Sequence, residues 1–384
     1  MNSQTPFAII TGDFVTTGGM DRANHALASY LLRQGHPVDL VAFRADDDLL
    51  AYPNAAFHRV VKPWNSYALG LSLLKVQGRD VATRVSALGG RVVANGGNCR
   101  WDDINWVHYV HSAWKPSHSG SLPRRIKSAY FHEKERRSER LCLRHCRVVI
   151  ANSERTRTDL IERLGLNPDR VRTVYYGSDP ARFHPATPDE KTTIRRDFGW
   201  DDDRPTVAFV GALGDARKGF DTLFDALKIL AKDSRWDARL AVVGTGATLD
   251  FWKQQAGAFG MATAISFLGF RKDVPRLLQA CDALISPTRY EAYGLNVHEA
   301  LCSGIPAFVT AAAGVAERYP AALHDWLIPN PDDAADLARR LLGWREGHGL
   351  AETSPAILAL SEQLRSETWD AMAEKFLSVV DELS

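Results

Sequence analysis

Short apolar runs alternate along the chain with longer stretches in which apolar residues recur every three or four positions. In the first half, the apolar runs predict strands at Phe7–Ile10, Val38–Phe43, Arg91–Ala94, Trp106–Val110, Val148–Ala151 and Val171–Tyr175. Stretches such as Arg22–Gln34 and Ser153–Leu164 have helical periodicity. Strands that alternate with helices favour a parallel sheet.

The alternation stops at residues 177–193, where three prolines and several polar residues suit a linker. It then resumes, with strands expected at Thr206–Val210, Leu240–Val243, Ile265–Phe267, Ala283–Ser286 and Ala307–Thr310. We therefore predict two Rossmann-like α/β domains, residues 1–187 and 188–365. Ligands of open parallel sheets bind outside the carboxyl ends of the strands, so we expect a cleft between the domains to hold them.

The length and composition agree with this organisation. A chain of 384 residues with 45% hydrophobic and 24% charged side chains can bury two cores, which excludes disordered and small disulfide-linked classes. The N-terminus has no basic segment before its short apolar run, and no window approaches ~18 apolar residues. The five cysteines lack zinc-binding spacing. We expect a cytoplasmic protein with free thiols.

The net charge of +1 hides an asymmetry between the two halves of the chain. Residues 1–187 carry 26 Lys and Arg against 17 Asp and Glu, a net of +9. The remaining residues carry 21 basic against 29 acidic side chains, a net of −8. A basic half joined to an acidic half predicts different partners for the two domains.

The segment richest in candidate chemistry is residues 286–306, SPTRYEAYGLNVHEALCSGIP. Glu291 and Glu299 are eight positions apart, with Gly294 between them at the entry of a predicted helix that runs to Ser303. Backbone N–H groups at the start of a helix favour a diphosphate. Glu299, about one turn deeper, can accept hydrogen bonds from ribose hydroxyls. Two solvated helix charges are the alternative for this spacing taken alone.

This segment resembles the E-x7-E signature of the retaining nucleotide-sugar glycosyltransferases of family 4, which have the GT-B fold. Further segments resemble the same family in the same order: TGGM at residues 17–20, ANSERTRTDL at 151–160, YYGSDPARFHP at 175–185, FVGALGDARKGFD at 209–221, VVGTG at 242–246 and FLGFRKDVPRLLQACDALISP at 267–287. The resemblance implies two Rossmann-like domains whose parallel sheets face each other across a central cleft. It also implies that the amphipathic segment 366–384 crosses back to the N-terminal domain.

The resemblance assigns roles to residues of the second domain. Glu291 would contact hydroxyls of the donor sugar and Glu299 the nucleotide ribose. Lys218 would neutralise the leaving diphosphate. The backbone of Gly294, Leu295, Asn296 and Val297 would hold the diphosphate, and Gly211 and Tyr293 are further donor-binding candidates. The family's arginine is replaced by Ala212, so Arg217 is the candidate substitute.

Two segments of the first domain also match family positions. Gly18 and Gly19 follow the first strand, where a glycine turn lets the backbone approach a phosphate or the acceptor. They do not form the G-x-G-x-x-G signature of dinucleotide binding. His111 matches a histidine that faces the donor sugar, whereas His108, three positions earlier, is expected to be structural.

Other polar residues carry weaker predictions. Thr310, Gly314 and Glu317 share a loop that lies near the nucleotide in the family, and they are equally compatible with a structural role. The D-x-D strings Asp46–Asp48 and Asp201–Asp203 are interpreted as solvated charge. We therefore expect neither a metal site nor a cofactor.

The reaction that the resemblance implies is transfer of a sugar from a nucleoside diphosphate sugar to a hydroxyl of a glycan or lipid-linked acceptor. The anomeric configuration would be retained, and polysaccharide or glycolipid assembly would be the process served. No nucleophile motif is visible, so a metal-independent front-face mechanism fits. A nucleotide-sugar epimerase or hydrolase of the same fold, and a noncatalytic sugar-binding homologue, remain as alternatives.

The basic excess of the first half is concentrated in residues 115–147, which hold ten basic and three acidic side chains. This stretch could adhere to an anionic membrane surface or recognise an anionic acceptor. It could equally be a solvated helix that Glu133, Glu135 and Glu139 partly balance. Nucleic acid is not expected as a partner, because interleaved aromatics and groove-binding motifs are missing.

Overall fold

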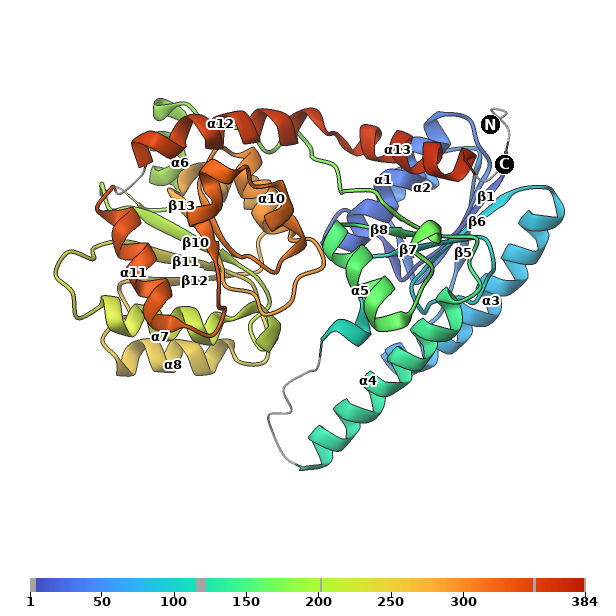
Figure 1. The fold of residues 1–384 in the computed structure, drawn as a ribbon, viewed down its shortest axis with the longest axis horizontal. Helices are drawn as coiled ribbons and strands as arrows, with labels where there is room; N and C mark the ends of the chain where they lie inside the picture. The colour runs from blue at the N-terminus through green and yellow to red at the C-terminus, as the bar shows by residue number, and fades with distance from the viewer. Residues whose placement is uncertain (1–4, 115–121, 201, 348–349, 383–384) are drawn as a thin grey trace. The chain divides into compact units, whose positions relative to one another are not determined.

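The computed structural model describes residues 5–114, 122–200, 202–347 and 350–382 (Figure 1). The chain forms two compact units, residues 1–177 with 369–384 and residues 178–368. Residues 178–187, which the sequence places with the first domain, belong to the second unit. The reason is local packing, because Phe183 is part of the second hydrophobic core.

The first unit contains a parallel sheet of seven strands. In spatial order they are β5 (Ala55–Arg59), β3 (Val38–Ala42), β1 (Phe7–Ile10), β6 (Arg91–Asn95), β7 (Ile104–Val107), β8 (Val148–Ala151) and β9 (Val171–Thr173). The chain starts in the middle at β1, adds strands on one side, and then continues from β6 on the other. The order therefore reverses between β1 and β6, and such a switch point is where ligands of this architecture bind.

Helices cover the sheet of the first unit: α1 (Gly19–Arg33), α3 (Tyr67–Ala87), α4 (Leu122–Leu143), α5 (Glu154–Leu164) and α13 (Trp369–Asp381), with short helices α2 (Asp47–Leu50), η1 (Pro63–Asn65), η2 (His111–Ala113) and η3 (Pro168–Arg170). A two-stranded ribbon joins β2 (Asp13–Phe14) to β4 (Arg44–Ala45). Ser153 caps α5 by accepting a hydrogen bond from the Thr156 N–H at 3.0 Å. None of the helices in the described part of the chain has the length and apolarity needed to span a bilayer.

The last helix, α13, packs on α1 within the first unit. Phe376 is buried and its ring lies 5.0 Å from that of Trp106. Arg33 of α1 donates to both carboxylate oxygens of Asp370, at 2.6 and 3.0 Å. The apolar positions that recur every three or four residues thus become one buried helix face.

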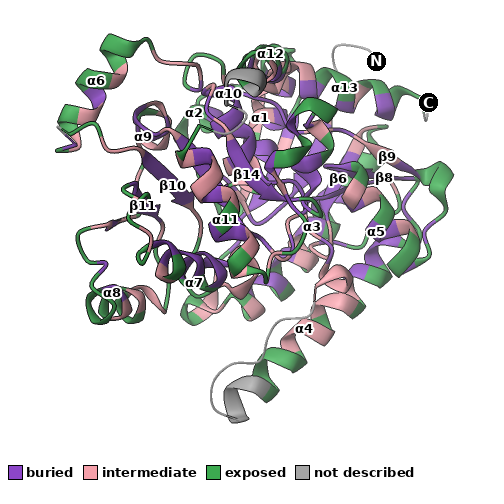
Figure 2. Cartoon of the chain, turned by 60° about the vertical axis from the view of Figure 1, so that its left-hand side comes forward, coloured by how far each residue is buried: buried purple, intermediate pink, exposed green. Residues whose placement is uncertain are grey.

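The second unit contains a parallel sheet of six strands. In spatial order they are β12 (Ile265–Gly269), β11 (Arg239–Val243), β10 (Thr206–Val210), β13 (Ala283–Ser286), β14 (Ala307–Thr310) and β15 (Leu327–Ile328). The switch point lies between β10 and β13, by the same reasoning as in the first unit. In Figure 2 the strands β10, β11 and β14 of this sheet are largely buried, whereas helices such as α6 and α8 have largely exposed outer faces. The edge strand β12 is mostly of intermediate exposure.

The helices of the second unit are α6 (Pro188–Asp197), α7 (Phe220–Leu230), α8 (Leu249–Ala258), α9 (Val274–Ala280), α10 (Leu295–Cys302), α11 (Ala334–Arg345) and α12 (Leu350–Ser366), with 3-10 turns η4 (Ala216–Lys218), η5 (Gly314–Arg318) and η6 (Ala321–Trp326). Thr187 and Glu190 form a reciprocal capping box at the start of α6. This cap explains why the proline-rich segment turns into a helix at Pro188.

Candidate active site

Lys218 and Glu291 form an ion pair at the carboxyl edge of the second sheet. Lys218 ends η4 in the connection after β10, and Glu291 lies in the loop after β13. The Lys218 ammonium donates to Glu291 Oε2, and the two side chains are 20% and 17% exposed. Because β10 and β13 are the strands on either side of the switch point, this pair stands where a ligand of the fold is expected.

Glycines let the loops beside this ion pair pack backbone against backbone. Gly219 has φ 66°, and a Cβ there would lie 1.9 Å from the carbonyl oxygen of Pro287. Gly246, in the loop after β11, would place a Cβ 1.4 Å from the carbonyl oxygen of Leu213. The Leu213 N–H in turn donates to Thr245 O at 2.9 Å. No side chain fits at either glycine, so their backbone geometry is required by the packing.

The entry of α10 is fixed by the loop that carries Glu291. Gly294 has φ 112°, and its carbonyl accepts hydrogen bonds from the N–H groups of Val297 and His298 at 3.0 and 3.1 Å. The N–H groups of Gly314 and Val315 donate to the carbonyls of Glu291 and Tyr293. The first N–H groups of a helix have no partner inside it, so this entry can bind an anion. The structure brings Gly314 to this loop through its backbone.

A buried pair lies beneath the helix entry, and of its two residues the sequence singled out only Tyr293. The Tyr293 hydroxyl lies 2.7 Å from His298 Nδ1, and both side chains are buried. Burial, with the nearby positive charge of Arg318 as a smaller cause, lowers the pKa of His298 to about 3. A neutral His298 therefore acts as a hydrogen-bonding support for the loop. Glu299 follows it and is 8% exposed.

Arg217 and Lys218 point to different partners. Arg217 Nη2 donates to Asp215 Oδ2 at 2.5 Å, whereas Lys218 binds Glu291. The Arg217 carbonyl accepts hydrogen bonds from Arg289 N and Thr288 Oγ1, at 2.7 and 2.8 Å. Asn296 Nδ2 donates to Val210 O at 3.0 Å, which ties α10 to β10. Among the predicted site residues of this unit, the structure thus places the Lys218 side chain directly on Glu291.

The first unit has a cavity of about 610 Å³ at the carboxyl ends of β6 and β7. Gly18, with φ 90°, and Gly19 open α1 so that the next residue, Met20, reaches this cavity, and His111 lies on its wall. The rest of the lining is largely aromatic or polar: Tyr67, Asn95, Trp106, Tyr109, Phe131, Lys134, Glu135 and Glu139. The structure therefore brings together two segments that the sequence singled out separately.

Two family models match the chain. The model described as Glycosyl transferases group 1 matches residues 190–352, and the model described as Glycosyltransferase Family 4 matches residues 17–182. The chain belongs to the family-4 glycosyltransferases.

Relatives of known name support this membership. The chain is 30% identical over 218 residues to mannosylfructose-phosphate synthase of Agrobacterium fabrum, which covers 54% of this chain and 47% of that protein. It is 32% identical over 181 residues to the lipopolysaccharide core biosynthesis mannosyltransferase LpsB of Rhizobium meliloti, covering 46% and 48%. The chain spans about half the length of these relatives.

Solved structures show the same fold. The crystal structure of WaaG, a glycosyltransferase involved in lipopolysaccharide biosynthesis, matches with a TM-score of 0.76 at 22% identity and covers 97% of this chain and 99% of that one. The sucrose-phosphate synthase of Thermosynechococcus elongatus matches with a TM-score of 0.76 at 17% identity, over 99% of both chains. The predicted GT-B fold is confirmed for this family-4 glycosyltransferase.

A buried carboxylate positions His111 in this family-4 chain. Glu139 accepts hydrogen bonds from the backbone N–H groups of His111 and Ser112, at 2.9 and 3.3 Å, and from Ser112 Oγ at 3.2 Å. Only 1% of Glu139 is exposed, and this burial raises the pKa of its carboxyl to about 7 despite these hydrogen bonds. The interpretation of Glu139 as a surface counter-charge was wrong, because the helix turns this residue inward.

His108 is a buried structural histidine of the same protein. Its Nε2 lies 2.7 Å from Asn95 Nδ2 and its Nδ1 lies 2.6 Å from the Tyr176 hydroxyl. Burial lowers the pKa of His108 to about 3, so it stays neutral. Both ring nitrogens serve the fold, as expected from its place three residues before His111.

The D-x-D strings differ in their surroundings. Asp48 pairs with His25 at 3.0 Å. Among the described residues, His25, Asp46 and Asp48 form the group whose ligand atoms lie close enough together to hold a metal ion. Asp201 lies outside the described residues, and Asp202 pairs with Arg239 at 2.5 Å. In η5, Glu317 is exposed, while Thr310 at the end of β14 is buried. Asp48 and Asp202 are therefore each paired with a basic side chain and not merely solvated.

Proposed function

We propose that this chain is a retaining glycosyltransferase that moves a sugar from a nucleoside diphosphate sugar to an acceptor hydroxyl without a metal ion. The Lys218–Glu291 ion pair at the switch point, beside the entry of α10, carries the proposal. It supplies a cation and a sugar-binding carboxylate at one place. Family membership supports the reaction class, and the ion pair supports the donor site.

The donor would replace the internal ion pair with two contacts of its own. The diphosphate binds the N–H groups at the entry of α10 and the ammonium of Lys218. Glu291, released from Lys218, accepts hydrogen bonds from sugar hydroxyls, and Glu299 accepts them from the ribose. Arg217 supplies a second cation when its pairing with Asp215 is exchanged for phosphate.

The chemistry then depends on charge stabilisation and positioning. The bond from the anomeric carbon to the phosphate oxygen breaks, and the acceptor oxygen forms a new bond on the same face of the sugar. The proton of the acceptor hydroxyl passes to the departing phosphate oxygen, so no protein base is needed. Lys218 and the α10 entry stabilise the charge that develops on the diphosphate.

The cavity of the first unit is the proposed acceptor site. Its aromatic walls at Tyr67, Trp106 and Tyr109 suit an apolar or sugar surface, and His111 supplies a polar group. The positioning of His111 by Glu139 keeps that group in a fixed place. Polysaccharide or glycolipid assembly is the proposed process, in keeping with the names of LpsB and WaaG.

We also propose that the first unit lies on an anionic membrane surface when the acceptor is lipid-linked. Residues 115–121 of the basic stretch lie outside the described residues. In the described part of α4, Ile126 and Tyr130 are exposed beside basic residues such as Lys127. Trp64, before α3, is 92% exposed. Exposed aromatic and apolar side chains among basic ones are typical of interfacial binding.

Product analysis tests the reaction against its alternatives. Purified protein is incubated in EDTA with an α-linked nucleotide sugar, with and without a glycan or glycolipid acceptor, and nucleotide release is followed. The proposal predicts acceptor-dependent release and an α-linked product in the proton NMR spectrum. Release without an acceptor would favour the epimerase or hydrolase, and donor binding without release would favour the noncatalytic homologue.

A further inference from the structure

Arg289 lies in the loop after β13, two residues before Glu291. Its side chain is 18% exposed and reaches η4 and the start of α7, the segment that carries Lys218. The loop with the proposed sugar-binding carboxylate and the segment with the proposed cation are therefore joined by a third residue. The sequence did not single out this residue.

All five N–H groups of the Arg289 guanidinium have an acceptor. Nε donates to Asp332 Oδ1 at 2.6 Å. Nη1 donates to Ala216 O at 2.6 Å and Asp221 Oδ1 at 2.8 Å, and Nη2 donates to Asp221 Oδ2 at 2.8 Å and Thr222 Oγ1 at 3.2 Å. These bonds use the full donor capacity of an arginine side chain. Arg289 can therefore act on the reaction through the residues that it holds, and not by binding the diphosphate itself.

The contacts of Arg289 bracket Lys218 along the chain. Ala216 lies two residues before Lys218, and Asp221 lies three residues after it. The backbone adds a further link, because the Arg289 N–H donates to Arg217 O at 2.7 Å. Lys218 thus has its backbone fixed, on both sides, relative to the loop that carries its carboxylate partner.

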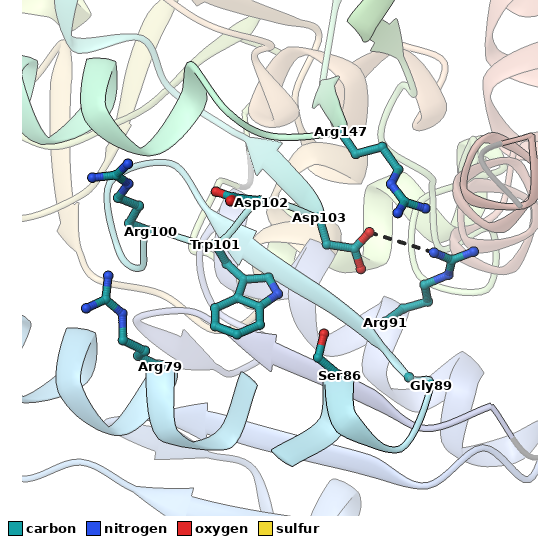
Figure 3. Close-up of a pocket in the computed structure, with 10 residues that line it drawn as sticks. Arg79, Ser86, Gly89, Arg91, Arg100, Trp101, Asp102, Asp103 and Arg147 are labelled. Atoms are coloured by element: carbon teal, nitrogen blue, oxygen red, sulfur yellow. Dashed lines mark ion pairs between the residues drawn. The ribbon is translucent and has the colours of Figure 1, made fainter. Parts of the chain in front are cut away.

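Arg91 offers a comparison from the first unit. It lies at the start of β6, its side chain is 17% exposed, and its Nη1 lies 3.8 Å from Asp103 Oδ1 (Figure 3). This pair stands at the amino edge of its sheet, whereas ligands of such sheets bind at the carboxyl edge. Arg289 is equally buried but follows β13 at the carboxyl edge, beside Lys218. Its position, and not its burial, distinguishes it from a purely structural arginine.

We propose that Arg289 is a positioning residue for the sugar transfer, which holds the η4–α7 segment against the Glu291 loop so that the Lys218 ammonium stays at the donor position. This rests on the proposed function, because Lys218 has its role there. A planar guanidinium suits the task, since its fork reaches two carboxylates, a carbonyl and a hydroxyl together, which the three donors of an ammonium cannot do. A positioned group that shifts by about 1 Å can lose most of its contribution to catalysis.

Calorimetric titration tests this role without an acceptor. The probes are UDP, GDP, ADP and TDP, with the matching monophosphates, which lack the phosphate that carries the sugar. For the nucleotide that binds, Arg289→Gln should weaken the diphosphate about tenfold, because Lys218 is no longer held in place, and should leave the monophosphate unchanged. Equal losses for diphosphate and monophosphate would indicate general damage to the site and would overturn the proposal.

Two further variants test whether the effect passes through Lys218. Arg289→Lys keeps the charge but not the fork, so it should lose nearly as much diphosphate affinity as Arg289→Gln. In the Lys218→Ala background, Arg289→Gln should weaken binding by less than about twofold further, because the group that it positions is already absent. Wild-type affinity in Arg289→Lys, or a full additional loss in the double variant, would overturn the proposal.

Hydrogen exchange of the ligand-free chain tests the link itself, independently of any substrate. The amides of Lys218 and of residue 289 are hydrogen-bonded within this segment, so both should exchange about tenfold faster or more in Arg289→Gln. Arg195→Gln is the matched control, because Arg195 is 13% exposed and pairs with Asp282 at the other end of β13. The control should leave these two amides unchanged, and equal effects of the two substitutions would overturn the proposal.

Failure of the proposed donor site and failure of the role of Arg289 give different results. If none of the four diphosphates binds, the donor site is overturned, while hydrogen exchange still shows whether Arg289 holds the Lys218 segment. Diphosphate binding that Lys218→Ala leaves unchanged would remove Lys218 from the site, and with it the role of Arg289. Unchanged exchange at residues 218 and 289 in Arg289→Gln would overturn the role of Arg289 alone.

Discussion

The Lys218 ammonium donates to Glu291 across the ends of two neighbouring strands, although 73 positions separate the residues in the chain. Each group compensates the charge of the other in a half-buried setting. The fold thereby keeps a cation and a carboxylate ready at one ligand position without leaving either charge unpaired.

Lys218→Ala should lower kcat by roughly 10²- to 10³-fold, because it removes stabilisation of the leaving diphosphate. The free energy of unfolding should fall by only about 1 kcal/mol, since the ion pair is partly exposed to solvent. Steady-state kinetics and urea denaturation measure the two effects. Lys228→Ala, which breaks an ion pair with Asp225 on the following helix, is the control and should leave kcat unchanged. Wild-type turnover in Lys218→Ala would remove Lys218 from the mechanism.

Substitutions of the two glutamates in the E-x7-E segment should affect the binding of different parts of the donor. Glu299→Gln should weaken the binding of a free nucleoside diphosphate by about tenfold, because one charge-assisted hydrogen bond to the ribose is lost. Glu291→Gln should leave that affinity unchanged and lower kcat/KM for the nucleotide sugar. Calorimetry with the nucleotide and kinetics with the sugar donor distinguish the two. The same loss of nucleotide affinity in both variants would contradict these roles.

Gly219 should resist substitution because of packing as well as backbone geometry. Gly219→Ala places a Cβ 1.9 Å from Pro287 O, so it should destabilise the second unit by more than about 3 kcal/mol. Gly260 has a similar φ, 69° against 66°, but no atom lies within 4 Å of a Cβ there. Gly260→Ala should therefore cost only about 1 kcal/mol. If urea denaturation shows the same loss of unfolding free energy in Gly219→Ala and Gly260→Ala, the contact with Pro287 does not add to the cost of the substitution.

Most of the sheet architecture could be predicted from the sequence. Strands such as β1, β8 and β10 are buried, so their apolar runs coincide with their observed bounds. The edge strand β5 was missed, because Ala55–Arg59 is half-exposed and has no continuous apolar run. The strand predicted at Trp106–Val110 is Ile104–Val107 instead. Val110 is buried although the strand ends before it, so a prediction from apolar residues alone put the end of this strand too late.

The contacts within the site were less predictable than its residues. Lys218 and Glu291 were each singled out through the family resemblance, but their pairing depends on β10 and β13 being neighbours. Glu139 lies in a strongly charged helix, so its burial has no local signal. The different directions of Arg217 and Lys218 follow from Asp215, two positions before Arg217. Such relationships are set by tertiary packing.

Glu139 should make folding stability fall as the pH rises from about 4.5 to about 7. Its pKa is raised from 4.5 to about 7 in the folded chain, so the folded state keeps a proton that the unfolded state loses in this window. The stabilising contribution of Glu139 is complete below pH 4.5 and is lost as the pH rises through 7. The free energy of unfolding falls by at most about 1.4 kcal/mol per pH unit in this window. Urea denaturation at several pH values measures it. Glu139→Gln should flatten this slope, and an unchanged slope would exclude Glu139 as the titrating group.

Binding of the donor tests the central claim most directly. Thermal unfolding of the wild-type chain is measured in EDTA with UDP-, GDP-, ADP- and TDP-sugars, and again with the Lys218→Ala and Lys228→Ala variants. The account predicts that one class of sugar nucleotide raises the unfolding temperature of the wild type and of Lys228→Ala, with a much smaller rise in Lys218→Ala. No stabilisation by any of the four, or the same stabilisation in Lys218→Ala, would contradict it.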